Sequence, residues 1–99
     1  MPYAIEFARS VEAHLKALSA RDRATALAAL ERQLTHEPLK DPKNRKPLRP
    51  NPVAPWELRV GDLRVFYEVT GAGRSLVRIL AVGRKERNVL TIGGKEIQL

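Results

Sequence analysis

The 99-residue sequence has no cysteine and only two histidines, His14 and His36. The absence of cysteine excludes disulfide bonds and thiolate zinc ligands, and two histidines argue against a metal-centred enzyme. We therefore expect no metal and no cofactor. The most apolar run, Leu76–Gly83, is interrupted by Arg78 and is much shorter than the about 20 apolar residues of a membrane span. The first residues lack a basic and apolar leader, so we expect a cytoplasmic protein without a membrane partner.

Length and charge narrow the function classes further. A chain of 99 residues, 43% of them apolar, predicts one globular domain over residues 1–99. The whole net charge of +7 lies in residues 40–99, and 12 of the 18 bases are arginine. Arginine binds phosphate through a two-pronged guanidinium. This excess predicts a polyanionic partner, nucleic acid or the ribosome, although a solvated basic surface is the alternative.

The first 36 residues predict a strand and a helix hairpin. Tyr3–Phe7 alternates like a strand. Apolar residues at helical spacing predict a helix over residues 8–19, and Asp22 can cap a second helix that ends near His36. The two helices are close enough in sequence to form an antiparallel hairpin.

The next segment, Glu37–Pro55, differs in kind because it holds six of the seven prolines and five Lys and Arg. We expect a long basic loop here, with neither helix nor paired strand. Strict alternation then predicts strands at Trp56–Val60 and Leu63–Val69, joined by a two-residue turn at Gly61-Asp62.

The last third predicts a turn at residues 70–74 and a central strand at Ser75–Val82. Residues 88–99 form either a hairpin that turns at Gly93-Gly94 or a C-terminal helix.

Together these elements predict an α+β fold of order β-α-α-β-β-β, with the helix hairpin packed on one face of an antiparallel-rich sheet. Seven alternating side chains should face the helices, and the opposite face should be exposed. They are Trp56, Leu58, Val60, Leu63, Val65, Tyr67 and Val69.

The exposed face carries an unusual pair of charges. If Gly61-Asp62 is the turn, Arg59 lies directly opposite Arg64, and like charges opposed across two strands destabilise the pairing. Either a phosphate group binds between the two arginines, or Glu57 and Glu68 on the same face neutralise them. The run Arg84-Lys85-Glu86-Arg87 at the end of the central strand is either a solvated turn or the second half of a basic groove.

These residues carry a resemblance to a known family. The stretches Trp56–Val69 and Ala81–Arg87, together with length and element order, resemble the RelE/ParE superfamily of bacterial toxins from type II toxin–antitoxin systems. RelE-like members are metal-independent, ribosome-dependent endoribonucleases that cleave mRNA, whereas ParE-like members inhibit DNA gyrase by protein contact. The resemblance also implies a cognate antitoxin that covers the helices and the basic face in a hetero-oligomer.

The resemblance implies roles for individual residues. Arg59 and Arg64 are expected to hold and stabilise the scissile phosphate, and Lys85 is the candidate for proton transfer because arginine keeps its proton in proteins. These three are the candidate catalytic residues. The candidate RNA-binding residues are Arg84, Arg87, Lys43, Arg45 and Lys46.

Two positions depart from the RelE pattern. Glu57 stands where RelE has a basic residue, and no tyrosine lies near Thr91, where RelE has one. Three functions therefore stay open: a ribosome-dependent ribonuclease, a gyrase inhibitor that is not an enzyme, and a degenerate toxin that only binds its antitoxin.

Overall fold

The computed structural model describes residues 3–36, 38, 44–71 and 75–99. In chain order, its elements are β1 (Ala4–Phe7), α1 (Val11–Lys16), α2 (Ala20–Leu34), β2 (Arg45–Pro47), β3 (Trp56–Val60), β4 (Leu63–Thr70), β5 (Leu76–Glu86), β6 (Val89–Ile92) and β7 (Lys95–Ile97).

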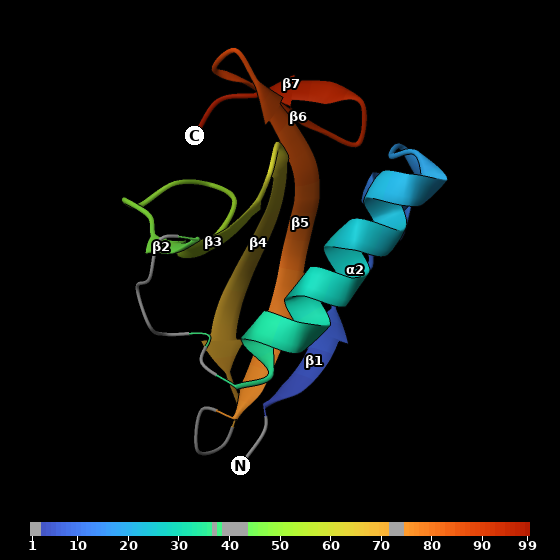
Figure 1. Cartoon of the computed structure of the whole chain (residues 1–99). Coiled ribbons are helices and arrows are strands. Elements are labelled where there is room, and N and C mark those ends of the chain that lie inside the picture. Colours follow the sequence, from blue (N-terminus) through green and yellow to red (C-terminus); the bar gives the residue numbers. More distant parts are fainter. Residues whose placement is uncertain (1–2, 37, 39–43, 72–74) are drawn as a thin grey trace.

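The strands form one sheet in the order β2-β3-β4-β5-β6-β7, and β1 pairs with the first half of β5. Every pairing is antiparallel except β1 with β5. The long α2 helix crosses one face of the sheet, and β6 and β7 stand at one end of the long, curved β5 (Figure 1). The predicted α+β class and the helix hairpin on one face are confirmed. The strand β2 was not predicted, and β6 and β7 form the C-terminal hairpin that was one of the two alternatives for residues 88–99.

The helix hairpin differs from the prediction at its ends. The first helix covers only Val11–Lys16, and the second starts at Ala20 because Ser19, not Asp22, is its N-cap. The Ser19 hydroxyl accepts a hydrogen bond of 3.1 Å from the backbone N–H of Asp22. Arg23 of α2 donates from Nε to the carbonyl of Leu15 and from Nη2 to the carbonyl of Leu18, so its side chain ties α2 to the segment in which α1 ends.

The main core lies between the helices and the sheet. All seven side chains predicted to face the helices belong to it: four are buried and three are packed partly buried against them. The helices contribute Val11, Ala26, Leu30 and Leu34 to the buried members of this layer, and β5 contributes Val77, Ile79 and Val82. Burying such aliphatic side chains stabilises the fold by roughly 1.5–3 kcal/mol each.

The opposite face of the sheet, here called the distal face, is not exposed as predicted. Phe66 at its centre is fully buried in a second apolar cluster with Ala54, Ala81, Leu90 and Ile92. Phe66 is covered by Ala54 from the segment before β3 and by Leu90 and Ile92 of β6. Sequence alternation alone could not reveal this, because the covering residues come from a loop and from the last hairpin.

The prediction that residues 37–55 contain no paired strand is wrong for Arg45–Pro47, which pairs with β3 as β2. Proline is tolerated there because β2 lies at the edge of the sheet, where a missing N–H breaks no second ladder. The following loop is ordered by Asn51, whose side-chain oxygen accepts hydrogen bonds from the N–H groups of Val53 and Ala54.

At the C-terminus, β5 runs four residues beyond the predicted Val82. Residues 88–99 form the hairpin and not the helix: Arg87 and Asn88 turn with φ of 51° and 66°, and Gly93 and Gly94 turn with φ of 61° and 80°. Of the predicted turn at residues 70–74, positions 72–74 lie outside the described residues.

Candidate functional site

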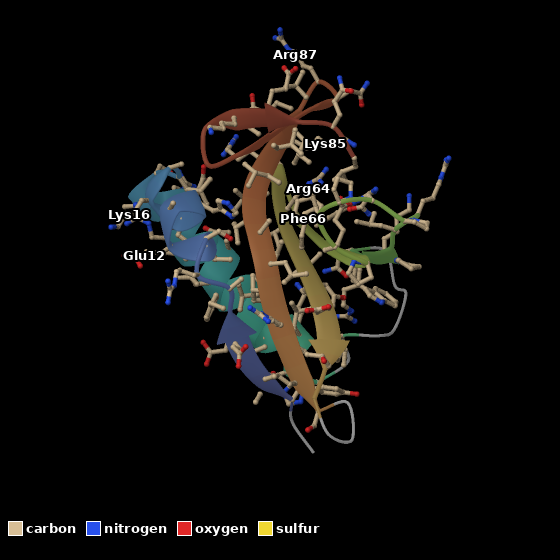
Figure 2. The ribbon with its side chains drawn as sticks, turned by 180° about the vertical axis from the view of Figure 1, so that it is seen from behind. Glu12, Lys16, Arg64, Phe66, Lys85 and Arg87 are labelled. Atoms are coloured by element: carbon tan, nitrogen blue, oxygen red, sulfur yellow. The ribbon has the colours of Figure 1, made fainter. Side chains whose placement is uncertain are left out.

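The candidate residues Arg59 and Arg64 lie directly opposite each other on β3 and β4, as predicted. Val60 pairs with Leu63 across the turn, and Arg59 pairs with Arg64 in the next position. Directly opposed residues have their Cβ atoms about 4.5–5.5 Å apart on the same face, so both side chains project from the distal face next to each other. Figure 2 views this face and shows Arg64 over β4, next to Phe66.

Glu57 lies between the two arginines. Its Oε1 atom is 2.8 Å from Nε of Arg59 and 3.9 Å from Nε of Arg64, and the residue is 4% exposed. The alternative in which acids on the same face neutralise the pair is therefore correct for Glu57. The second acid of that alternative, Glu68, is instead paired in register with Arg78 further along the sheet.

Arg64 is held firmly by its own turn. Its Nη1 group donates hydrogen bonds to the carbonyls of Gly61 (2.8 Å) and Leu63 (2.9 Å), and its side chain is only 13% exposed. Its buried Nε group has no hydrogen-bond partner among the described residues. A buried donor without a partner costs about 1–3 kcal/mol, so this guanidinium retains an unused capacity to bind an acceptor.

The basic run after Val82 divides between the two faces of the sheet. Arg84 lies on the helix side, opposite Leu63, where it forms ion pairs with Asp22 of α2, with Asp62 and with Glu86. Hydrogen bonding to Glu86, together with attraction to Asp22, raises the pKa of Arg84. Arg84 therefore does not join the arginine pair, and its charge is matched by neighbouring acids.

Lys85 points the other way because of a β-bulge. The β4–β5 register slips between Phe66 and Tyr67, which leaves Leu80 as an extra residue on β5. One extra residue exchanges the two faces for everything that follows. Lys85 consequently lies on the distal face, two residues beyond the Gly83 that pairs with Arg64, and Figure 2 shows the two side chains over the same end of the sheet.

The remaining predicted RNA-binding residues are scattered. Arg87 lies in the β5–β6 turn at the tip of the molecule (Figure 2). Arg45 reaches toward the helix side and donates to Gln33 of α2. Lys46 pairs in register with Glu57 and so lies on the distal face, and Lys43 lies outside the described residues.

Four bases from four strands thus gather on one side of the sheet around a single buried acid. We call this group the basic strip, and it consists of Lys46, Arg59, Arg64 and Lys85, with Glu57 between the arginines. Such a strip can bind a phosphodiester, since arginine supplies forked donors and lysine a mobile ammonium group. Among the described residues, no three His, Cys, Asp or Glu side chains are placed to hold a metal ion.

His14 accepts a hydrogen bond from the backbone of β5, a structural role that the sequence did not reveal. Strand β1 covers β5 as far as Ile79, and β6 covers it from Gly83 onward. In the gap between them, the N–H of Val82 donates to Nδ1 of His14 at 3.4 Å. Burial lowers the pKa of His14, which favours the neutral ring that can accept this bond.

The structure also shows an open cavity of about 540 Å³ beside His14, lined by residues of α1, β5 and the C-terminal hairpin. No helix among the described segments is long and apolar enough to cross a membrane.

Comparisons with known proteins place these features in a family. The sequence model described as the ParE toxin of type II toxin–antitoxin systems matches residues 5–89. The toxin–antitoxin complex RelBE2 of Mycobacterium tuberculosis contains a chain that is 28% identical, with a TM-score of 0.68, over 86% of this chain and 100% of that one. A chain of the archaeal RelE–RelB complex of Pyrococcus horikoshii OT3 has the same fold, with a TM-score of 0.66 and 24% identity over 88% and 99% of the two chains. No curated protein matched the sequence.

Proposed function

This chain belongs to the ParE toxin family of type II toxin–antitoxin systems, and we propose that it acts as a RelE-like, metal-independent, ribosome-dependent endoribonuclease that cleaves mRNA. The observation that carries this proposal is the basic strip, in which Arg59, Arg64 and Lys85 converge on one face from three neighbouring strands.

In this reaction the ribose 2′-hydroxyl gives its proton to solvent, its oxygen attacks the adjacent phosphorus to form a 2′,3′-cyclic phosphate, and the bond from phosphorus to the 5′-oxygen breaks. Negative charge grows on the phosphoryl oxygens in the transition state, and preorganised cations stabilise it. Arg64 suits this part because its guanidinium is fixed by the Gly61 and Leu63 carbonyls. Arg59 adds a more exposed fork, and Lys85 transfers the proton to the leaving oxygen, a contribution that is typically 10²–10⁴-fold.

The cognate antitoxin is the second proposed partner. The RelBE2 neighbour was solved as a toxin–antitoxin complex. This chain offers an apolar surface for such a partner: Phe7 on β1 is 45% exposed and lies between two shallow grooves that also contain Leu15 and Leu27 of the helices. An antitoxin segment that folds on binding would cover this surface and extend to the basic strip.

The test of the nuclease is a bacterial translation reaction programmed with a defined mRNA. Purified protein is added and cuts are mapped by primer extension, with and without ribosomes. The wild type should cut only with ribosomes, and the Arg59→Ala/Arg64→Ala double variant should lose the cuts. The matched control is Arg78→Ala, which removes one arginine from the same face further along β5. Absence of cuts with undisturbed translation would contradict the proposal.

A second candidate function is inhibition of DNA gyrase by protein contact. It is favoured by one observation, the pairing of Glu57 with Arg59, which reduces the charge available to a phosphate. A gyrase inhibitor should bind a purified topoisomerase subunit and block supercoiling while leaving mRNA intact. A protein that only forms the antitoxin complex and affects neither process would be a degenerate toxin.

A further inference from the structure

Glu57 is an unusual residue to find in the middle of a cluster of bases. It is the one charged residue among the buried side chains of the described segments, at 4% exposed. It occupies the space in which a bound phosphate group would meet both arginines. Lys46, its register partner on β2, adds a further base on the same face.

The carboxylate satisfies one arginine and not the other. Both ion pairs involve the same oxygen atom, Oε1, which accepts a hydrogen bond from Nε of Arg59 at 2.8 Å. Its distance of 3.9 Å to Nε of Arg64 is too long for a hydrogen bond, and that buried Nε group has no other partner among the described residues. One negative charge thus faces two positive charges, and the Nε group of Arg64 still lacks a hydrogen-bond acceptor among the described residues.

A phosphate group would complete the cluster better than the carboxylate does. Its oxygens point in several directions, so it can accept from two guanidinium groups at once. The side chain of Arg59 is 40% exposed and can turn toward such a ligand, whereas Arg64 is fixed by backbone carbonyls and its buried Nε group lacks a hydrogen-bond partner among the described residues.

We propose that Glu57 is an internal anion that competes with a phosphate group of RNA for Arg59 and Arg64, and so limits the affinity of the basic strip for RNA. The proposal rests on the proposed function for the identity of the ligand. It assigns Glu57 no part in the bond-breaking step. Glu57 keeps the toxin from binding free RNA tightly, and productive binding then needs the additional contacts that a ribosome-bound mRNA provides.

The test compares Glu57→Gln with the wild type in binding a short, unstructured single-stranded RNA. Fluorescence anisotropy over a range of salt concentrations gives the affinity and its salt dependence. Glu68→Gln is the matched control, since it removes the same charge from the same face but pairs in register with Arg78. The slope of log K against log salt is about −0.7 per phosphate contact for single strands, so one additional contact should steepen it by about 0.7.

The proposal predicts that Glu57→Gln binds RNA roughly tenfold more tightly than the wild type at low salt, with the steeper slope, and that Glu68→Gln shows a much smaller gain. In the Glu57→Gln/Arg59→Ala double variant the gain should disappear. Equal gains in the two single variants would show a general charge effect and would overturn the proposal. Unchanged or weaker binding by a folded Glu57→Gln variant would overturn it as well.

A measurement on the wild-type protein tests the same competition and does not depend on whether the Glu57→Gln variant folds. Titration with inorganic pyrophosphate, followed through the Nε–H signals of Arg59 and Arg64 in NMR spectra, should shift both signals together. Signals that do not move, while other surface arginines respond, would contradict the competition. None of these readouts requires ribosomes or cleavage. The nuclease proposal can therefore fail while the competition holds, and the reverse outcome is equally distinguishable.

Discussion

Gly83 offers a sharp steric prediction, because β6 passes too close to this position of β5 to leave room for a side chain. A Cβ atom at this position would lie 2.2 Å from the carbonyl oxygen of Thr91 and 2.9 Å from Cγ1 of Ile92. The nearer atom belongs to the backbone of the paired strand and cannot rotate away. In Gly83→Ala, β6 must therefore move away from β5, which also disturbs the second apolar cluster that contains Ile92.

Overpacking of a tight core usually costs about 1–3 kcal/mol, and the backbone clash at Gly83 places this variant near the upper value. For a domain of this size, about 3 kcal/mol corresponds to a fall in Tm of about 12–24 °C. The assay is thermal unfolding followed by circular dichroism. The control is Gly61→Ala, where the new Cβ meets nothing within 4 Å and only the φ of +59° opposes the change. It should cost about 1–2 kcal/mol.

A Gly83→Ala protein whose Tm lies within about 4 °C of the wild type would rule out a severe clash with Thr91, since that shift corresponds to less than about 1 kcal/mol. Equal losses in Gly83→Ala and Gly61→Ala would also refute it, because they would trace the effect to the loss of glycine and not to the Thr91 contact.

Three other predictions concern single side chains. Tyr67→Phe should lower the free energy of unfolding in urea by about 1–3 kcal/mol, because the buried hydroxyl donates to the carbonyl of Pro38 at 2.5 Å; an unchanged midpoint would contradict this role. Burial lowers the pKa of His14 from 6.5, so the unfolded chain binds a proton at this residue more readily than the folded protein does. The contribution of neutral His14 to the free energy of unfolding is therefore complete above pH 6.5 and should fall as the pH drops from 6.5 toward the lower pKa of the folded state. Melting curves across that range check it, and His14→Gln should abolish the fall. Arg84→Ala should cost about 1 kcal/mol in low salt and less in high salt, since its ion pairs are partly exposed; a salt-independent loss in Tm would argue against an electrostatic role.

The arginine pair shows what local sequence can predict. The Gly61-Asp62 turn fixes the register of its two flanking strands, and register then forces Arg59 opposite Arg64. The same alternation placed Glu57 and Glu68 on the face of the pair, and we expected both acids to neutralise it. Only Glu57 lies beside the two arginines; Glu68 is four residues further along β4 than Arg64 and pairs in register with Arg78.

The basic run at the end of β5 shows where such reasoning stops. A one-residue bulge at Leu80 sends Arg84 to the helix side and Lys85 to the distal face, and no local sequence signal marks that bulge. The cover over Phe66 was also unpredictable, since it depends on the contact of Ala54, Leu90 and Ile92 across long sequence separations. Local patterns thus predicted the elements, and long-range packing decided which charges share a face.

If the distal face carries the chemistry, substitutions of the neighbouring bases Lys85 and Arg84 should have opposite consequences for mRNA cleavage. They are adjacent in sequence, but they lie on opposite faces of the sheet. We would measure the rate of ribosome-dependent mRNA cleavage for Lys85→Ala and for Arg84→Ala, each checked for folding. We expect a loss of about 10²–10⁴-fold for Lys85→Ala and a rate close to the wild type for Arg84→Ala. Equal losses in both variants, or a greater loss for Arg84→Ala, would show that the distal face does not carry the chemistry.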